Sequence, residues 1–373
     1  MRDPTVVLLP GDGVGPEVAR EARLVLGLVA PDVAVDERLL GAAAIRATGD
    51  PLPEDTLAAC LGASAVLKGP VGDPEFDAAD VRPEQGLLRL RGALDACRRA
   101  TAVLKGPVGD PEFDAADVRP EQGLLALRSA LDTYANLRPA VQGDTDVLIV
   151  RELVGGLYFG ARGTREDGTV FDTCEYHPRQ VERIVRRGFE LARGRRRRLT
   201  SVDKANVLET SRLWRRTVDG IAPSYPDVEV EHMLVDNAAM QLATTPQQFD
   251  VIVTENMFGD ILSDLAAAVT GGLGLAPSAS LSDGGPGLFE PVHGSAPDIA
   301  GRGASNPTAM LRSTALLLEH GLGLRDRADA LTRAIDAALA TVRTPDLGGG
   351  ATTAQLGAAV REQLAVDGTV AVS

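Results

Sequence analysis

Aromatic side chains, cysteines and long apolar runs are all scarce in this chain of 373 residues. Phe, Trp and Tyr make up only 3% of it, so a core must be built from smaller aliphatic side chains. The three cysteines (Cys60, Cys97 and Cys174) are odd in number and widely spaced, which indicates free thiols in a reducing compartment. The first apolar run, residues 6–9, is too short for a signal peptide or a membrane span, which predicts a cytoplasmic protein without a membrane partner.

Positive charge is also in deficit, because 38 basic residues face 52 acidic ones and the net charge is −14. This balance argues against broad binding to nucleic acid or to anionic membranes. The arginine-rich run at residues 193–198 follows a predicted helix, where cations favour the helix dipole, and we interpret it as solvated. An acidic protein that binds an anionic substrate must gather its arginines in one place.

Short apolar runs alternate with helical patterns along most of the chain. Strands are predicted at residues 6–9, 65–67, 146–150, 199–202, 228–230 and 251–254. Helices are predicted at residues 16–29, 178–193, 211–220 and 259–269, and the segment from 306 to about 365 is mostly helical. This alternation is typical of α/β architecture with a largely parallel or mixed sheet.

One segment of the chain is present twice. Residues 65–95 and 102–132 are near-copies that differ only at positions 89/126 and 92/129. Two copies do not make a solenoid, so we interpret them as a local duplication. Both copies suit the same structural slot, and we expect a strand from one copy and the helix of the second, with about 37 residues looped out.

Two groups of charged residues suggest a site for a metal and a dicarboxylate. Asp260 and Asp264 are four residues apart, so on a helix both carboxylates project from one face and suit Mg²⁺ or Mn²⁺. An isolated pair of this kind is more often a solvated helix face. Arg128, Arg138 and Arg151 each lie beside apolar residues, and converging arginine forks would recognise a dicarboxylate. Each arginine alone is more often structural.

Four further features bear on proton transfer and cofactor binding. Lys204 follows a strand as a candidate buried lysine, and Tyr158 is a phenol among glycines; either alone is more often structural. The turn at residues 11–16 is not a GxGxxG fingerprint, so we interpret it as a strand-to-helix turn that borders the cofactor. The better cofactor candidate is the segment 290–301, where small residues allow close approach and Asp298 can accept hydrogen bonds from a ribose.

Together these segments resemble the 3-isopropylmalate dehydrogenase branch of the decarboxylating hydroxy-acid dehydrogenases. The motifs that carry the resemblance stand in family order from residue 4 to about 350: LLPGDGVGPEV, RPEQGLLALR, ANLRP, DVLIVREL, GGLYFG, SVDKANVLE, TENMFGDILSDLA and FEPVHGSAPDIAG. The resemblance implies oxidation of 3-isopropylmalate by NAD and its decarboxylation to 4-methyl-2-oxopentanoate, with a divalent metal, in leucine biosynthesis.

The resemblance also implies a role for each site residue. Tyr158 and Lys204 would transfer protons, and Asp236, Asp260 and Asp264 would hold Mg²⁺ or Mn²⁺. Arg128, Arg138 and Arg151 would bind the substrate carboxylates, while Glu121, Leu124 and Leu125 would form the pocket for its branched alkyl group. The NAD site would comprise Glu290, His293, Gly294, Ser295, Ala296, Asp298 and Asn306.

The implied fold has two α/β domains around a mixed central sheet. Residues 1–135 and 271–373 would form a discontinuous cofactor-side domain, and residues 136–270 a domain for dimerisation, substrate and metal. Asp236 and Lys204 would come from the partner subunit, so a monomer would be inactive. No nucleic acid or membrane partner is expected.

Three departures from the family pattern leave alternatives open. The first repeat copy is extra, and only the second places an arginine (Arg128, not Arg91) ten residues before Arg138. The segment 139–146 is shortened, and Lys-Gly-Pro at 68 and 105 is more like the isocitrate-using relatives. The alternatives are a related acid (D-malate, tartrate, 3-methylmalate or homoisocitrate) and a folded but catalytically impaired remnant.

Overall fold

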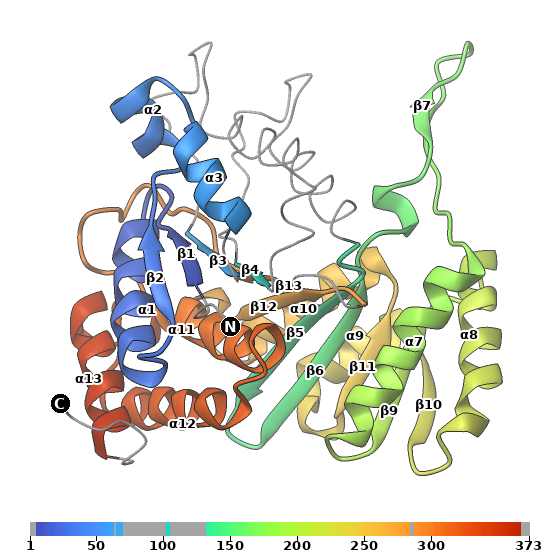
Figure 1. The fold of residues 1–373 in the computed structure, drawn as a ribbon. Coiled ribbons are helices and arrows are strands. Elements are labelled where there is room, and N and C mark those ends of the chain that lie inside the picture. The colour runs from blue at the N-terminus through green and yellow to red at the C-terminus, as the bar shows by residue number, and fades with distance from the viewer. Residues whose placement is uncertain (1–4, 63–64, 70–101, 105–131, 284–286, 367–373) are drawn as a thin grey trace. The chain divides into compact units, whose positions relative to one another are not determined.

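The chain divides into two compact α/β units in a computed structural model that describes residues 5–62, 65–69, 102–104, 132–283 and 287–366 (Figure 1). Unit 1 comprises residues 1–132 and 273–373, and unit 2 comprises residues 133–272. These boundaries differ by two or three residues from the predicted ones; the roles assigned to the two domains stay predictions. Within the described residues, no helix is long and apolar enough to cross a membrane.

Unit 1 is built on strands that alternate with helices. Its strands run in the order β12 (Pro277–Leu281), β13 (Gly287–Pro291), β4 (Ala102–Leu104), β3 (Ala65–Lys68), β1 (Thr5–Leu9) and β2 (Ala34–Glu37). All neighbouring pairs are parallel except β12 with β13. The helices are α1 (Gly15–Val29), α2 (Ala42–Thr48), α3 (Glu54–Gly62), α11 (Thr308–Leu316), α12 (Arg325–Thr341) and α13 (Thr353–Val366), with short turns at 273–275, 317–321 and 345–347.

The duplicated strands occupy neighbouring places in unit 1. β3 and β4 carry the same Ala-Val-Leu sequence and pair in parallel, with Ala65 opposite Ala102 and Val66 opposite Val103. The outer edge of β3 pairs with β1, and the outer edge of β4 pairs with β13. The prediction that only one copy supplies a strand was therefore wrong. Both strands enter the sheet, because each has the same sequence and presents backbone N–H and C=O groups that can pair with a neighbouring strand.

Unit 2 contains a second group of strands, in the order β10 (Glu229–Leu234), β9 (Arg198–Asp203), β11 (Val251–Thr254), β6 (Thr145–Glu152) and β5 (Ala135–Gln142). They are parallel except β5 with β6. Its helices are α7 (Pro178–Arg193), α8 (Glu209–Ile221), α9 (Val235–Thr244) and α10 (Asn256–Val269), with short turns at 156–158, 222–224 and 246–248. The predicted α/β class is confirmed.

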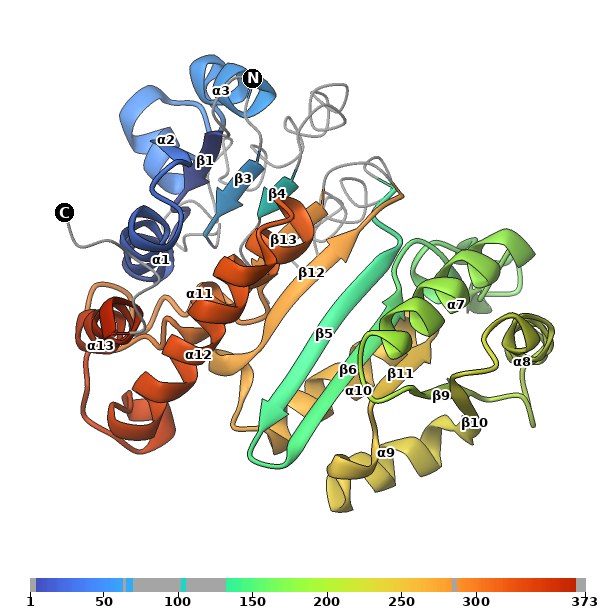
Figure 2. The same ribbon diagram turned by 60° about the horizontal axis from the view of Figure 1, so that its bottom comes forward.

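The helices of unit 2 pack in two pairs (Figure 2). α7 packs on α8, and its buried side chains Val181, Ile184 and Val185 face the strands. α9 packs on α10 over a core that includes Leu242, Leu262 and the β11 residue Ile252. Along the sheet, the connection from β9 to β10 through α8 runs in one direction, and the connection from β10 to β11 through α9 runs in the opposite direction. Because both crossovers are right-handed, α8 and α9 cover opposite faces of the sheet.

The sequence did not predict β5. The shortened segment 139–146 forms a hairpin in which β5 and β6 pair along their whole length, from Ala135 opposite Glu152 to Gln142 opposite Thr145. Gly143 has a φ of 57° in the two-residue turn, as turns that match the twist of a hairpin require. The hairpin thereby places Arg138 and Arg151 on adjacent strands of unit 2.

The arginine-rich run at 193–198 is exposed at every residue except Arg195, which is half-buried, so the interpretation of a solvated run holds for all but that arginine. Arg195 donates to Asp146 at 2.8 Å and to Asp250 at 2.9 Å, and Asp250 is only 1% exposed. Arg193 binds Asp227 at 2.6 Å. From the segment before β9, Arg195 thereby joins the start of β6 to the residue before β11, and Arg193 joins the end of α7 to the segment before β10.

Candidate functional site

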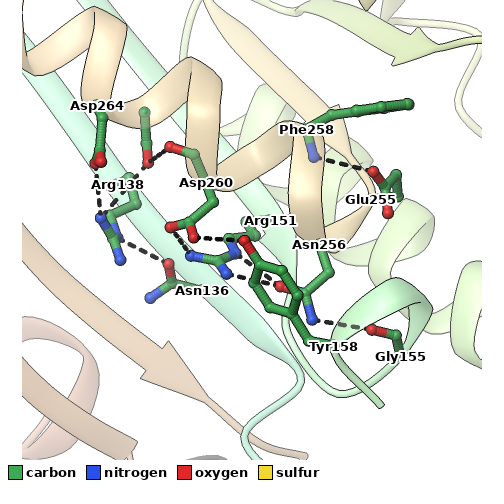
Figure 3. Close-up of polar contacts among 11 residues, drawn as sticks. Asn136, Arg138, Arg151, Gly155, Tyr158, Glu255, Asn256, Phe258, Asp260 and Asp264 are labelled. Carbon is green, nitrogen blue, oxygen red and sulfur yellow. Dashed lines mark hydrogen bonds and ion pairs between the residues drawn. The ribbon is translucent and has the colours of Figure 1, made fainter. Parts of the chain in front are cut away.

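The candidate site lies where α10 follows β11 in unit 2. β11 is buried at all four residues and ends at Thr254, and Glu255 then caps the helix by accepting a 2.9 Å hydrogen bond from the amide of Phe258. Asp260 and Asp264 follow on one face of α10, as their spacing predicted (Figure 3). Their side chains are 34% and 60% exposed, so both carboxylates are open to a ligand.

Arg151 on β6 is the innermost charge of the site, with a side chain only 2% exposed. Its Nη1 forms an ion pair with Oδ1 of Asp260. Its Nε and Nη2 both donate to Oδ1 of Asn256, at 3.0 and 2.7 Å. Gly259 makes this approach of α10 possible, because a Cβ there would lie 2.6 Å from Cγ of Arg151.

Arg138 on β5 contacts the second aspartate of the pair. Its Nη1 lies 3.7 Å from Oδ1 of Asp264 and 3.5 Å from Oγ of Ser263. Its Nε donates to Oδ1 of Asn136 at 2.9 Å. The two arginines and two aspartates predicted from separate motifs therefore lie together (Figure 3).

Tyr158 completes this group. It lies in the turn at 156–158, and its hydroxyl donates to Oδ2 of Asp260 at 2.9 Å. Burial, followed by the negative charge of Asp260, raises the pKa of the Tyr158 phenol to about 12. The side chain is consequently a protonated phenol at neutral pH.

Lys204 and Asp236 form a separate pair, with Nζ 2.6 Å from Oδ1. The Lys204 side chain is 27% exposed, so the prediction of a buried lysine was wrong. Its hydrogen bond to Asp236 lowers the pKa of that carboxyl. Among the described residues of one chain, no three His, Cys, Asp or Glu side chains gather into a metal-binding group, so Asp236, Asp260 and Asp264 do not form one within a single chain.

Four predicted substrate residues lie outside the described residues: Glu121, Leu124, Leu125 and Arg128. Of the predicted substrate-binding residues, the structure therefore describes only Arg138 and Arg151.

The predicted cofactor segment follows β13 in unit 1. Nδ1 of His293 donates to the carbonyl of Gly294 at 3.0 Å, while its buried Nε2 has no hydrogen-bond partner in the described part of the chain. Burial lowers the pKa of His293, so its imidazole is neutral. Gly294 has open space where a Cβ would stand. An imidazole nitrogen without a partner beside open backbone is suited to a polar ligand.

The N-terminal glycine turn packs against this segment. The amide of Val14 donates to the carbonyl of Ser295 at 2.9 Å, and a Cβ on Gly13 would lie 2.2 Å from that carbonyl oxygen. Ala296 has a φ of 42°, and Asp298 is exposed. Glu290 and Asn306 are buried, and Asn306 binds Asp346 at 2.9 Å and the amide of Thr308 at 3.0 Å.

The sequence did not predict the side chains that bind the two arginines, nor the one that binds the neighbouring loop at Val154 and Gly155. Asn136 and Asn256 contact the arginines directly, and Glu152 accepts amide hydrogen bonds from Val154 and Gly155 at 3.2 and 2.8 Å. Asn136 stands two residues before Arg138, a spacing that puts both on one face of a strand. No local signal linked Asn256 to Arg151, which is 105 residues away.

Comparison with known proteins identifies the class. The family model described as isocitrate/isopropylmalate dehydrogenase matches residues 5–98 and 91–360, so each repeat copy falls within a match. The chain is 47% identical to a 3-isopropylmalate dehydrogenase of Zymomonas mobilis over 95% of its length and 98% of that protein. It is 48% identical to one of Shouchella clausii, over 92% of the chain and 91% of that protein.

Solved structures agree with the sequence comparison. The isocitrate dehydrogenase from Methylococcus capsulatus has a TM-score of 0.76 at 35% identity, covering 97% of this chain and 99% of its own. The β-decarboxylating dehydrogenase from Thermococcus kodakarensis gives 0.75 at 33% identity, covering 97% and 96%. Fold and matches together define a decarboxylating dehydrogenase. The chain belongs to the isocitrate/isopropylmalate dehydrogenase family.

Proposed function

We propose that this protein oxidises and decarboxylates 3-isopropylmalate with NAD in leucine biosynthesis, in the cytoplasm. The observation that carries the proposal is the group formed by Arg138, Arg151, Tyr158, Asp260 and Asp264 in unit 2. It combines cations for carboxylates, oxygen ligands for a metal and a protonated phenol. The relatives named as 3-isopropylmalate dehydrogenases support the same substrate.

Arginines bind the substrate carboxylates in this proposal. A guanidinium presents several N–H groups in a plane, which matches the two oxygens of a carboxylate. Arg138 and Arg151 supply such groups from adjacent strands, and Arg128 would supply the third. Leu124 and Leu125, with Glu121, would surround the isopropyl group.

The donor set of α10 fits a divalent cation. Asp260 and Asp264 offer carboxylate oxygens on one rigid face, which Mg²⁺ and Mn²⁺ prefer. Asp236 would add a third carboxylate from the partner subunit. When bound, the cation would act as a Lewis acid toward oxygen atoms of the substrate.

The segment 290–301 fits a dinucleotide. The unpartnered Nε2 of His293 and the open space beside Gly294 are suited to a polar ligand, and Ser295 and Ala296 would line the site beside them. Asp298 would accept hydrogen bonds from ribose hydroxyls, the choice expected for NAD, and Glu290 and Asn306 would complete the site. NAD, when bound, supplies the acceptor for the hydride that leaves the hydroxyl-bearing carbon.

Side chains of the protein itself would transfer two protons, one from the substrate hydroxyl and one to a substrate carbon. Lys204, paired with Asp236, would assist removal of the hydroxyl proton as the alcohol becomes a ketone. The carboxylate on the carbon next to the new ketone then leaves as CO₂, and the electrons of the broken bond remain on that carbon as an enolate, while the carboxylate bonded to the ketone stays in the product. The phenol of Tyr158, which its raised pKa keeps protonated at neutral pH, would donate the proton that this carbon needs.

A homodimer with shared sites is part of the proposal. The apolar side chains Met240 on α9 and Ile261 on α10 are 57% and 56% exposed. The hairpin of β7 (Arg162–Thr164) and β8 (Val170–Asp172) extends from the body of unit 2, and Val170 on it is 73% exposed (Figure 1). A two-stranded hairpin is marginally stable alone, so a second copy of the chain is the fitting partner for these surfaces.

The test is an assay with Mn²⁺, NAD⁺ and a panel of 3-isopropylmalate, isocitrate, D-malate, tartrate, 3-methylmalate and homoisocitrate. We expect 3-isopropylmalate to give the highest kcat/KM. A wide preference for D-malate would contradict the leucine pocket and favour a related dehydrogenase. Inactivity toward every acid, in a protein that melts cooperatively, would instead favour the impaired remnant; the extra strand β4 between β3 and β13 is the feature that would then explain it.

A further inference from the structure

Each described arginine of the site is held by a buried asparagine in the same way. Nε of Arg138 donates to Oδ1 of Asn136 at 2.9 Å, and Nε of Arg151 donates to Oδ1 of Asn256 at 3.0 Å. Both asparagines are almost fully buried, at 0% and 1% exposed. Figure 3 shows each guanidinium in contact with one asparagine and one aspartate: Arg138 with Asn136 and Asp264, and Arg151 with Asn256 and Asp260.

This arrangement determines which part of each guanidinium faces the site. A guanidinium has one N–H on Nε and two on each Nη. In Arg151 the asparagine oxygen takes the edge formed by Nε and Nη2, which leaves Nη1 for Asp260. In Arg138 the asparagine takes Nε, and Nη1 faces Ser263 and Asp264. A carboxylate can then approach both arginines only from their Nη ends.

The amide of Asn256 cannot simply turn over. Its Nδ2 donates to the carbonyl of Gly155 at 2.9 Å, so its oxygen must point to Arg151. Its backbone amide donates to the hydroxyl of Tyr176 at 2.9 Å. The carbonyl of Gly155 is in turn part of the loop whose amides bind the buried Glu152. Asn256 therefore connects a fixed loop to the arginine.

We propose that Asn136 and Asn256 are positioning residues that orient Arg138 and Arg151 for the substrate carboxylates. This inference rests on the proposed function, since it assigns the arginines to a dicarboxylate. The asparagines touch neither substrate nor cofactor; they act by occupying Nε. Because a flexible arginine loses more freedom on binding than a fixed one, the held arginines bind a carboxylate more tightly.

The test is a double-mutant cycle on substrate affinity. Calorimetric titration with 3-isopropylmalate and Mn²⁺ is carried out for wild type, Asn256→Ala, Arg151→Lys and the double variant. Lysine has no Nε–Nη edge, so an asparagine that acts through the guanidinium loses its influence in that background. We expect Asn256→Ala to weaken binding roughly 10- to 100-fold in wild type and less than about threefold beside Arg151→Lys. Asn136→Ala with Arg138→Lys should behave likewise.

A matched control separates positioning from general loss of stability. Thr254→Val removes a buried hydrogen bond of 2.9 Å to the carbonyl of Val202 in the same unit; Thr254 pairs with Arg151 across β11 and β6, but its hydroxyl makes no hydrogen bond to a described arginine side chain. It should lower the melting temperature as the asparagine variants do, yet leave substrate affinity unchanged. Additive effects in both cycles, or an equal loss of affinity with Thr254→Val, would overturn the positioning role. A wild-type protein that binds no acid of the panel would overturn the proposed function itself.

Discussion

The hydroxyl of Tyr158 donates a 2.9 Å hydrogen bond to Oδ2 of Asp260, whose other oxygen pairs with Arg151. One carboxylate thus connects the predicted proton donor with a predicted carboxylate-binding arginine. The proton of the phenol points into the site, and the raised pKa keeps it on the oxygen across the physiological range.

Tyr158→Phe should consequently lower kcat by about 10²- to 10⁴-fold, the usual contribution of a positioned acid. The KM for the acid should change little, because the phenol transfers a proton rather than binding a carboxylate. Steady-state kinetics measure both constants. Tyr225→Phe is the control, since that ring stacks on Phe189 outside the site, with 4.6 Å between the ring centroids. Loss of the Tyr225 hydroxyl should therefore leave kcat intact. A raised KM with an unchanged kcat would contradict the role.

The two LLxLR arginines allow a comparison within one chain. Arg128→Ala should reduce kcat/KM at least about 30-fold, the effect of removing one partner of a buried charge pair. Arg91→Ala should be nearly silent, because the first copy lacks the following ANLRP segment. Both residues lie outside the described ranges, so kinetics with the preferred acid must decide. Comparable losses at both positions would refute the assignment to the second copy.

The neighbouring strands β3 and β4 predict that one repeat copy can be removed. A single Ala-Val-Leu strand can pair with β1 on one edge and β13 on the other, since each copy already makes one of those pairings. Deleting residues 65–101 or residues 94–130 leaves one complete copy, and the two products differ at only two positions. Both should fold and keep wild-type kcat/KM within a few-fold, measured by thermal melting and the acid assay.

A deletion that removes both strands provides the control for that experiment. Removing residues 65–104 deletes β3 and β4 together and leaves neither copy of the strand to pair with β1 and β13. This variant should fail to fold. If both whole-repeat deletions fail as well, the second strand is an essential part of unit 1.

Shared active sites predict complementation between inactive variants. Lys204→Ala and Asp260→Asn should each be inactive alone. Co-refolded as a mixed dimer, the Lys204→Ala subunit contributes Asp260 and its partner contributes Lys204, which restores one complete site. Random pairing should recover about a quarter of wild-type activity, since half the dimers are mixed and each has one working site. If mixing restores nothing, Lys204 acts within its own chain and the shared site is refuted.

Glu152 predicts a pH-dependent stability. It is fully buried, and burial raises its pKa to about 7. Because the folded-state pKa lies above the unfolded value, its contribution to stability is complete below about pH 4 and is lost as pH rises through 7. Between pH 5 and 8, the free energy of unfolding of wild type relative to Glu152→Gln should therefore fall by about 2 to 3 kcal/mol.

Urea unfolding at both pH values measures this difference. Glu166→Gln, on the exposed turn of the β7–β8 hairpin, is the control and should show no dependence on pH relative to wild type. A Glu152→Gln difference that is the same at pH 5 and 8 would show that the buried carboxyl does not titrate in this range.

The sequence alone determined the α/β class and most of the elements. The predicted helix at 178–193 coincides with α7, and the strand at 251–254 coincides with β11, because their apolar periodicity and flanking turn residues are local signals. The four-residue spacing of Asp260 and Asp264 likewise fixed their common face. Their roles came from the ordered motifs and stay proposals.

Only the tertiary structure decided which distant groups meet. The tight turn at Gly143 places Arg138 beside Arg151, and the closeness of α10 at Gly259 brings Asn256 to the guanidinium. It also placed both repeat strands side by side and paired Arg195 with the buried Asp250. Such contacts depend on how elements far apart in the chain pack together, and a single sequence carries no local pattern for them.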